Sequence, residues 1–248
     1  ATALATRSAA FLYEQLVALR AEPGGDRLTD EFSAVLLKAM LIHTAAWGAA
    51  YDHLKAVLKP AAMREDKFKR IVARFLGFGF VEPIESLVGA DHRATMLGCG
   101  TLVSDSAHEY RIPLPQSLSG VRGLRRVVVT LAWLSPIYAR HRNYRGAALW
   151  FDIENDKLAT KRKDAEWRSA RNGTVQHEIF EGERAAAFAE DATMVIRVNC
   201  RADANSLDGA VRYGLVVSIE VAEELRVPVY EEIAARIRAA VIVAAPAT

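Results

Sequence analysis

Histidine is the side chain best suited to acid–base or metal chemistry near neutral pH, and the 248-residue chain has six of them. They are His43, His53, His92, His108, His141 and His177. Zinc enzymes place histidines at short fixed spacings, such as His-Glu-x-x-His, and none of the six forms such a motif. His43 lies in an apolar helical stretch and is expected to be a hydrogen-bonded core residue. The sequence therefore predicts no metal ion and no other cofactor.

Serine and glycine motifs give equally little support for catalysis. A serine nucleophile needs a base within reach and a third group that orients the base. Ser135, in "WLSP", has neither in a recognisable pattern. Gly77 and Gly79, in "LGFGF", might suggest a phosphate cradle, but the dinucleotide motif has a third glycine and follows a strand. We expect a tight turn there and assign no catalytic or cofactor-binding residue.

Two basic stretches contain aromatic residues, a combination that nucleic-acid-binding surfaces use. They are 140–145, "RHRNYR", with Tyr144, and 157–171, "KLATKRKDAEWRSAR", with Trp167. Acidic residues interrupt the positive charge, and the formal net charge of the whole chain is only +2. We therefore expect solvated loops and no nucleic-acid partner. No apolar run approaches the ~18 residues of a membrane span, so no membrane partner is expected either.

Composition is that of an ordinary globular protein, with 51% hydrophobic and 25% charged residues. Cys99 and Cys200 are far apart and lack metal-type spacing. Two buried thiols in a reducing compartment are favoured over a disulfide, which indicates the cytoplasm. The opening "ATALATRSAAFLYEQLVALR" is helical from its first residues, so we expect the chain to be a piece of a longer protein.

The first 93 residues have helical periodicity. Leu12, Leu16 and Leu19 recur at spacings of three and four, and Pro23 followed by two glycines ends this helix. The next stretch, "DEFSAVLLKAMLIHTAAWG", is apolar around most of its circumference and is predicted to be a buried helix that stops at Gly48. Its expected core residues are Leu36, Leu37, Met40 and Leu41. Two further helical stretches lead to "LGFGF".

From residue 94 the pattern changes to short β-branched and aromatic runs, including "RRVVVTLAWLS", "GAALWFDI", "TMVIRVNCRA" and "RYGLVVSIEVAE". No helix-length segment separates these runs, which favours an antiparallel β-sandwich. The predicted fold class is α+β, with a helical domain at 1–93 and a jelly-roll-like sandwich at 94–248. A final segment, 229–241, is expected to be a helix or an extended tail. The predicted sandwich core contains Trp133, Leu149, Trp150, Val195, Ile196, Val216 and Ile219.

Three segments in order resemble the end of a subtilisin-like serine protease domain. "ATALATRSAAFLYEQL" is similar to the small-residue helix that follows the Gly-Thr-Ser nucleophile motif of that family. "AVLLKAMLIHTAAWG" (34–48) resembles the next subtilase helix, and "LGFGFVEPIESLVG" (76–89) resembles the closing "GxGxVdxxxAL" phrase. The chain lacks the proline usual near Ala3 or Leu4, and 49–74 is longer than a compact subtilase needs. "RRVVVTLAWLSP" also resembles a strand of the C-terminal sandwich modules of larger subtilases.

The resemblance implies that the serine, histidine, aspartate and oxyanion-hole asparagine all precede Ala1, so no catalytic residue transfers to this chain. It implies the C-terminal region of a serine endopeptidase, which supplies scaffold and an accessory sandwich but is inactive alone. The implied partners are an upstream protease domain, a protein or peptide substrate, and a second copy bound through an exposed helical face. The alternative is a non-catalytic interaction or ligand-binding module. A carbohydrate-binding version would need exposed aromatics, with Trp133, Trp150 and Trp167 as candidates.

Overall fold

The computed structural model describes residues 2–22, 24–81, 87, 89–140, 144–154, 158–164, 173–203 and 206–239. Within these residues the fold is mixed α+β and all strand pairs are antiparallel, as the sequence predicts at this level. The helices are α1 (Thr2–Arg20), α2 (Ser33–His43), α3 (Gly48–Leu58), α4 (Glu65–Leu76) and α6 (Val229–Ala239). The strands are β1 (Ala45–Ala46), β2 (Phe80–Val81), β3 (Arg93–Leu102), β4 (Ala107–Pro113), β5 (Arg125–Trp133), β6 (Ala147–Glu154), β7 (Lys161–Asp164), β8 (Val175–Gly182), β9 (Thr193–Ala202) and β10 (Val211–Val221).

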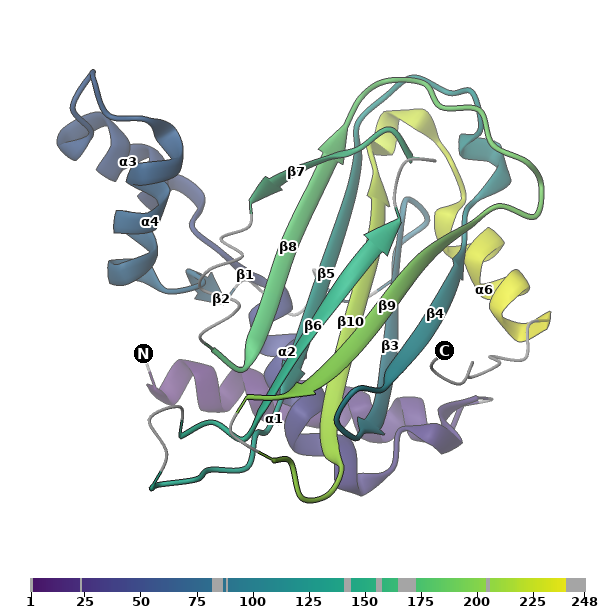
Figure 1. Cartoon of the computed structure of the whole chain (residues 1–248). Coiled ribbons are helices and arrows are strands. Elements are labelled where there is room, and N and C mark those ends of the chain that lie inside the picture. The colour runs from purple at the N-terminus through teal and green to yellow at the C-terminus, as the bar shows by residue number, and fades with distance from the viewer. Residues whose placement is uncertain are drawn as a thin grey trace.

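Two sheets form the body of the molecule (Figure 1). One has the strand order β3-β10-β5-β8-β7 and the other has the order β4-β9-β6. Their facing sides share one apolar core, to which β5 contributes Val127, Val129, Leu131 and Trp133. The intervening residues of β5 point to the opposite face of the large sheet and are also buried there, which explains the nearly continuous apolar run of this strand.

Seven residues were predicted to form the core of the sandwich. Four of them lie there, two are only half-buried, and one is buried on the other face of the large sheet. Trp133, Leu149, Ile196 and Ile219 lie in the core between the sheets. Trp150 and Val195, which are direct neighbours of two of these residues, are only half-buried. Successive side chains of a strand point to opposite faces, so neighbours such as Leu149 and Trp150 cannot both face the core. Val216 is buried as predicted, but on the other face of the large sheet, within a separate cluster.

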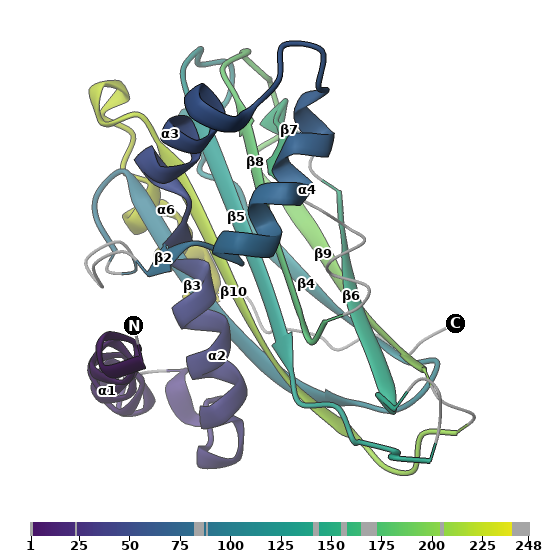
Figure 2. The ribbon, with the colours of Figure 1, turned by 90° about the vertical axis from the view of Figure 1, so that its left-hand side faces the viewer.

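Helix α2 covers that other face of the large sheet, where it lies along β10 and β5 (Figure 2). Its buried residues are Val35, Leu36, Ala39, Met40 and His43, while Leu37 and Leu41 are half-buried. The backbone of Val35 approaches Gly214 of β10 so closely that a Cβ on Gly214 would lie 2.7 Å from the Val35 carbonyl oxygen. Glycine at this position therefore lets the helix dock directly on the sheet.

Helix α1 packs on α2 and is the outermost helix on this side (Figure 2). Only Leu12 and Leu16 of its nineteen residues are buried. Large apolar side chains on the remaining surface are exposed, namely Leu4, Phe11, Tyr13, Val17 and Leu19, with exposed fractions of 41–69%. An exposed helix of a globular protein usually carries polar residues on its solvent side, so α1 has more apolar surface than its contacts within this chain use.

Helices α3 and α4 are inserted between the two strands of a short antiparallel pair. Strand β1 pairs with β2 through Ala45↔Val81 and Ala46↔Phe80, and both helices lie between the two strands in sequence. Figure 1 shows the helices projecting away from the sandwich. The long segment at 49–74 is thus two helices, and α2 ends at His43 instead of continuing to Gly48 as predicted.

The C-terminal segment and the cysteines complete the comparison with the sequence. Residues 229–239 form helix α6, which contacts β3 and β4, so of the two predicted forms the helix is the one observed. Cys99 on β3 and Cys200 on β9 are free thiols; Cys200 is buried as predicted, whereas Cys99 is only half-buried. Among the described residues, no helix combines the length and the apolar character that crossing a bilayer requires.

Candidate functional site

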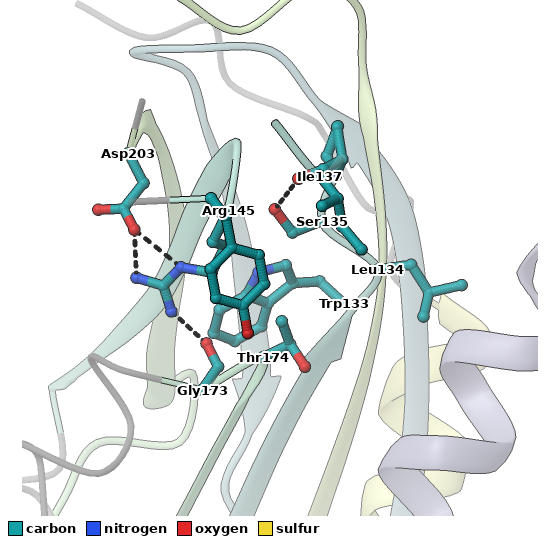
Figure 3. Close-up of a pocket in the computed structure, with 10 residues that line it drawn as sticks. Trp133, Leu134, Ser135, Ile137, Arg145, Gly173, Thr174 and Asp203 are labelled. Atoms are coloured by element: carbon teal, nitrogen blue, oxygen red, sulfur yellow. Dashed lines mark hydrogen bonds and ion pairs between the residues drawn. The ribbon is translucent and has the colours of Figure 1, made fainter. Parts of the chain in front are cut away.

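A pocket opens at the end of β5, where the chain leaves Trp133 and turns away from the large sheet (Figure 3). Its volume is about 470 Å³, which lies within the range of small-ligand sites. The segment after β5, the segment before β6 and the segment before β8 line it, with Asp203 after β9. These parts are distant in sequence, and the fold brings them together because β5 pairs with β8 and β6 pairs with β9.

The polar side of this pocket is a half-buried ion pair. Arg145 Nη2 lies 2.7 Å from Asp203 Oδ2, and Arg145 Nε donates to the same oxygen over 2.9 Å. The side chains are only 14% and 18% exposed, so the pair is shielded from most solvent screening. Arg145 also donates to the Gly173 carbonyl, and Figure 3 shows the arginine between these two partners. The pair neutralises its own charge, so it favours an uncharged polar ligand group over an ion.

The opposite side of the pocket is apolar and open to solvent. Ile137 is 71% exposed, Tyr144 is 62% exposed and Leu134 is 52% exposed. Large apolar side chains at a concave rim are typical of a ligand or partner site. Two residues of the basic stretch at 140–145 therefore have a place in this pocket: Arg145 is paired with Asp203, and Tyr144 lines the pocket. Residues 141–143, including His141, and 165–172, including Trp167, lie outside the described residues.

Ser135 lines the pocket, but its hydroxyl is committed to the backbone. The hydroxyl donates to the Pro136 carbonyl over 3.0 Å and accepts from the Ala147 N–H over 2.9 Å. A serine nucleophile would instead donate its proton to a general base. Ser135 therefore fixes the turn after β5, in agreement with the sequence-based interpretation.

The second notable group of polar residues is buried beneath the C-terminal end of α2. His43 Nδ1 is 2.9 Å from Thr130 Oγ1, and His43 Nε2 is 2.8 Å from Ser218 Oγ. Thr130 Oγ1 is in turn 2.7 Å from His177 Nδ1, and Ser218 Oγ is 2.8 Å from Thr95 Oγ1. The result is a continuous hydrogen-bonded chain of five side chains, which we call the histidine relay.

The Ser218–His43 distance alone matches a nucleophile and its base, but the surroundings exclude that role. His43 is 8% exposed and Ser218 is 5% exposed, so a substrate cannot reach either. The other nitrogen of His43 meets a threonine hydroxyl where a catalytic triad has a carboxylate. Burial lowers the pKa of His43 well below its usual value, and the nearby His177, Arg126 and Arg93 lower it further. His43 therefore has a structural role in its neutral form, and it is the hydrogen-bonded core histidine that the sequence predicts.

The remaining described histidines occupy three separate places. His53 is exposed on α3, and His108 bonds through Nδ1 to the Tyr213 hydroxyl over 2.7 Å. His92 lines a second pocket with Arg126, Glu181, Glu220 and Glu223. Across the described ranges, no group of three or more histidine, cysteine or acidic side chains has a geometry that could hold a metal ion.

The glycines of "LGFGF" are turn residues. Gly77 and Gly79 have φ values of 58° and 109°, which a side chain would strain. A Cβ on Gly79 would also lie 2.2 Å from the Ala46 carbonyl oxygen, so this glycine is needed for β2 to approach β1. The tight turn predicted for this stretch is thus observed.

Sequence reasoning missed the residues that connect the layers. Lys38 reaches from α2 to the ends of β5 and β8, where Nζ donates to the carbonyls of Trp133 and Thr174 over 3.1 and 3.2 Å. Burial lowers the pKa of this lysine. A lysine in an apolar helix is the one sequence signal that was available, since its partners are 95 and 136 residues away.

A scan against models of protein families and a search of curated proteins both gave no match to the chain.

Proposed function

We propose that this chain is the C-terminal region of a subtilisin-like serine endopeptidase, in which it provides scaffold and an accessory β-sandwich. The catalytic triad would belong to another part of that protein. Three sequence segments support the proposal through their order and character: 1–16, 34–48 and 76–89. In the structure they correspond to α1, α2 with the start of the β1–β2 hairpin, and the end of that hairpin.

The structural observation that carries the proposal is the uncovered apolar surface of α1. Phe11 is 46% exposed and Leu4 is 69% exposed, although α1 is similar to a helix that is buried on several sides in the subtilases. Burying an exposed leucine or phenylalanine side chain contributes about 1.5–3 kcal/mol. Five large apolar side chains of α1 are exposed, so their burial against a neighbouring catalytic domain would stabilise that contact.

The decisive experiment labels the full-length gene product with a fluorophosphonate probe, which reacts with activated serines. We expect the label on a serine shortly before Ala1, and trypsin would then release it in a peptide that ends at Arg7. The 248-residue chain by itself should take up no label and should not hydrolyse casein. A label on Ser135, or a full-length product without any label, would contradict the proposal.

A matched control uses the serine that lines the pocket. Ser135→Ala in the full-length product should leave labelling and casein turnover unchanged, because its hydroxyl bonds only to backbone groups in the interactions described above. Loss of labelling in this variant would indicate that Ser135, in the sandwich, is the nucleophile, and would refute the scaffold role.

The second candidate, a non-catalytic ligand-binding module, rests on the pocket in Figure 3. The exposed Tyr144 and Ile137 beside the paired Arg145 and Asp203 suit a neutral ligand with one apolar face. Trp133 cannot serve as a carbohydrate platform because its side chain is fully buried, and Arg201 lies 5.7 Å over the ring of Trp150. Tyr144→Ala should abolish binding in a glycan or peptide array if this function is correct.

A further inference from the structure

The histidine relay connects the helical layer to the large sheet at a single buried point. His43 comes from α2, whereas Thr95, Thr130, His177 and Ser218 come from β3, β5, β8 and β10. Elsewhere α2 meets the sheet through apolar side chains and Lys38. His43 is therefore the α2 side chain in this contact whose ordinary pKa lies nearest to neutral pH.

Donor and acceptor counts show that the relay is complete when both histidines are neutral. Thr95 can donate to Ser218, which donates to His43 Nε2, while His43 Nδ1–H donates to Thr130. Thr130 then donates to His177 Nδ1, and the opposite direction satisfies the same atoms equally well. Each hydroxyl uses its single proton within the chain, so neutral His43 needs no further partner.

A proton on His43 would meet an unfavourable electrostatic environment. Arg93 of β3, Arg126 of β5 and His177 of β8 all disfavour the charged form. Two acidic residues of the sheet, Glu181 of β8 and Glu220 of β10, face Arg126 at 3.7 and 3.6 Å and are partly neutralised by it. The C-terminal end of α2 favours a cation, but burial is the largest effect and opposes it.

We propose that His43 is a pH-sensitive latch that holds α1 and α2 on the large sheet and loosens them when its imidazole becomes protonated. The inference is independent of the proposed function, because it concerns contacts within this chain only. Once α2 lifts from the sheet, His43 enters water and regains its ordinary affinity for a proton. Acid therefore favours the lifted state.

The expected size follows from proton linkage. The docked state has the lower pKa, so docking is fully stable above the ordinary histidine pKa of about 6.5 and weakens as the pH falls through it. If docked His43 stays neutral over this range, the equilibrium constant for lifting rises about tenfold between pH 7.5 and 5.5. Further acidification continues the trend until the docked pKa is reached.

Hydrogen–deuterium exchange of the full chain, corrected for the intrinsic effect of pH on amide exchange, tests the latch. Exchange of α2 amides should accelerate about tenfold between pH 7.5 and 5.5. Amides of β9, which lies in the other sheet, should change much less. Equal acceleration in α2 and β9 would indicate global unfolding and overturn the proposal.

Histidine variants separate the latch from other titrating groups. His43→Gln keeps one donor and one acceptor near Thr130 and Ser218 but cannot titrate, so it should remove the acceleration. His53→Gln, on an exposed histidine, and His177→Gln should both retain it. Retention in His43→Gln, or loss in His177→Gln alone, would overturn the proposal.

A measurement on the unsubstituted chain covers the case in which His43→Gln does not fold. An NMR titration should show no protonation of His43 between pH 7.5 and 5.5 in the folded chain. A midpoint near 6.5 for His43 would refute the latch.

Discussion

Gln176 closes an edge of the sandwich with its side chain, and replacing it provides a demanding test of the fold. The side chain is buried on β8, where its amide faces the backbone of Phe151 on β6. Phe151 N–H donates to Gln176 Oε1 over 2.8 Å, and Gln176 Nε2 donates to the Phe151 carbonyl over 3.2 Å. The amide thus acts as a short additional strand along β6, which among the described residues pairs with β9 on its other side.

The substitution Gln176→Met keeps the length of the side chain and removes these bonds. It also removes the bond from Gln176 Nε2 to Glu178 Oε1, which is 2.8 Å long. Each hydrogen bond contributes about 1 kcal/mol. The three bonds therefore add up to about 3 kcal/mol, and the apolar methionine recovers about 1 kcal/mol through burial. We expect the free energy of unfolding to fall by about 2 kcal/mol.

Urea denaturation followed by circular dichroism measures this change. The transition midpoint should shift to lower urea at an unchanged slope, because the surface exposed on unfolding stays the same. Gln116→Met, at an exposed position, is the matched control and should alter stability by less than about 0.5 kcal/mol. A loss below about 1 kcal/mol for Gln176→Met would refute the edge-closing role.

Three further outcomes test other parts of the fold. Leu36→Ala should lower the free energy of unfolding by about 2–5 kcal/mol in urea titrations, and Leu37→Ala by less, because Leu37 is only half-buried. Gly79→Ala should lower the thermal midpoint more than Gly24→Ala, because only at Gly79 does an added Cβ meet backbone atoms. Burial and Glu31 raise the pKa of Cys99 to about 11, so its alkylation rate should continue to rise about tenfold per pH unit up to pH 10. A plateau near pH 8.5 would contradict this.

The sequence predicted the order and type of the elements better than their faces. Helical periodicity before residue 93 and β-branched runs after it were sufficient for the α+β class. The sequence did not show which residues of β6 and β9 face the core. Leu149 and Trp150 are both apolar, so the alternation of buried and exposed side chains cannot be seen from their types. The strands β3 and β4 also gave weak signals, because "MLGCGT" and "AHEYR" contain glycine, histidine and charged residues that strands usually disfavour.

The relay could not be predicted for a different reason. Thr130 and Ser218 are 87 and 175 residues from His43, and a hydroxyl in a strand looks the same whether or not a histidine reaches it. The sequence could indicate only that a histidine in an apolar helix needs partners. Which strands provide them depends on how α2 docks, and this follows from Gly214 and from the apolar face of the sheet.

If the chain has the proposed function, the position of α2 between α1 and the large sheet would give the sandwich a mechanical role. Helix α1 contacts α2, and α2 contacts β10, β5 and β8, so a displacement of the sheet face reaches α1 through one helix. In the proposed function α1 follows the nucleophile, whose position must be held within about 0.5 Å for efficient catalysis. Side chains that fix α2, above all Lys38 and His43, would then influence turnover without touching substrate. In the proposed function the large sheet would support the nucleophile helix through α2.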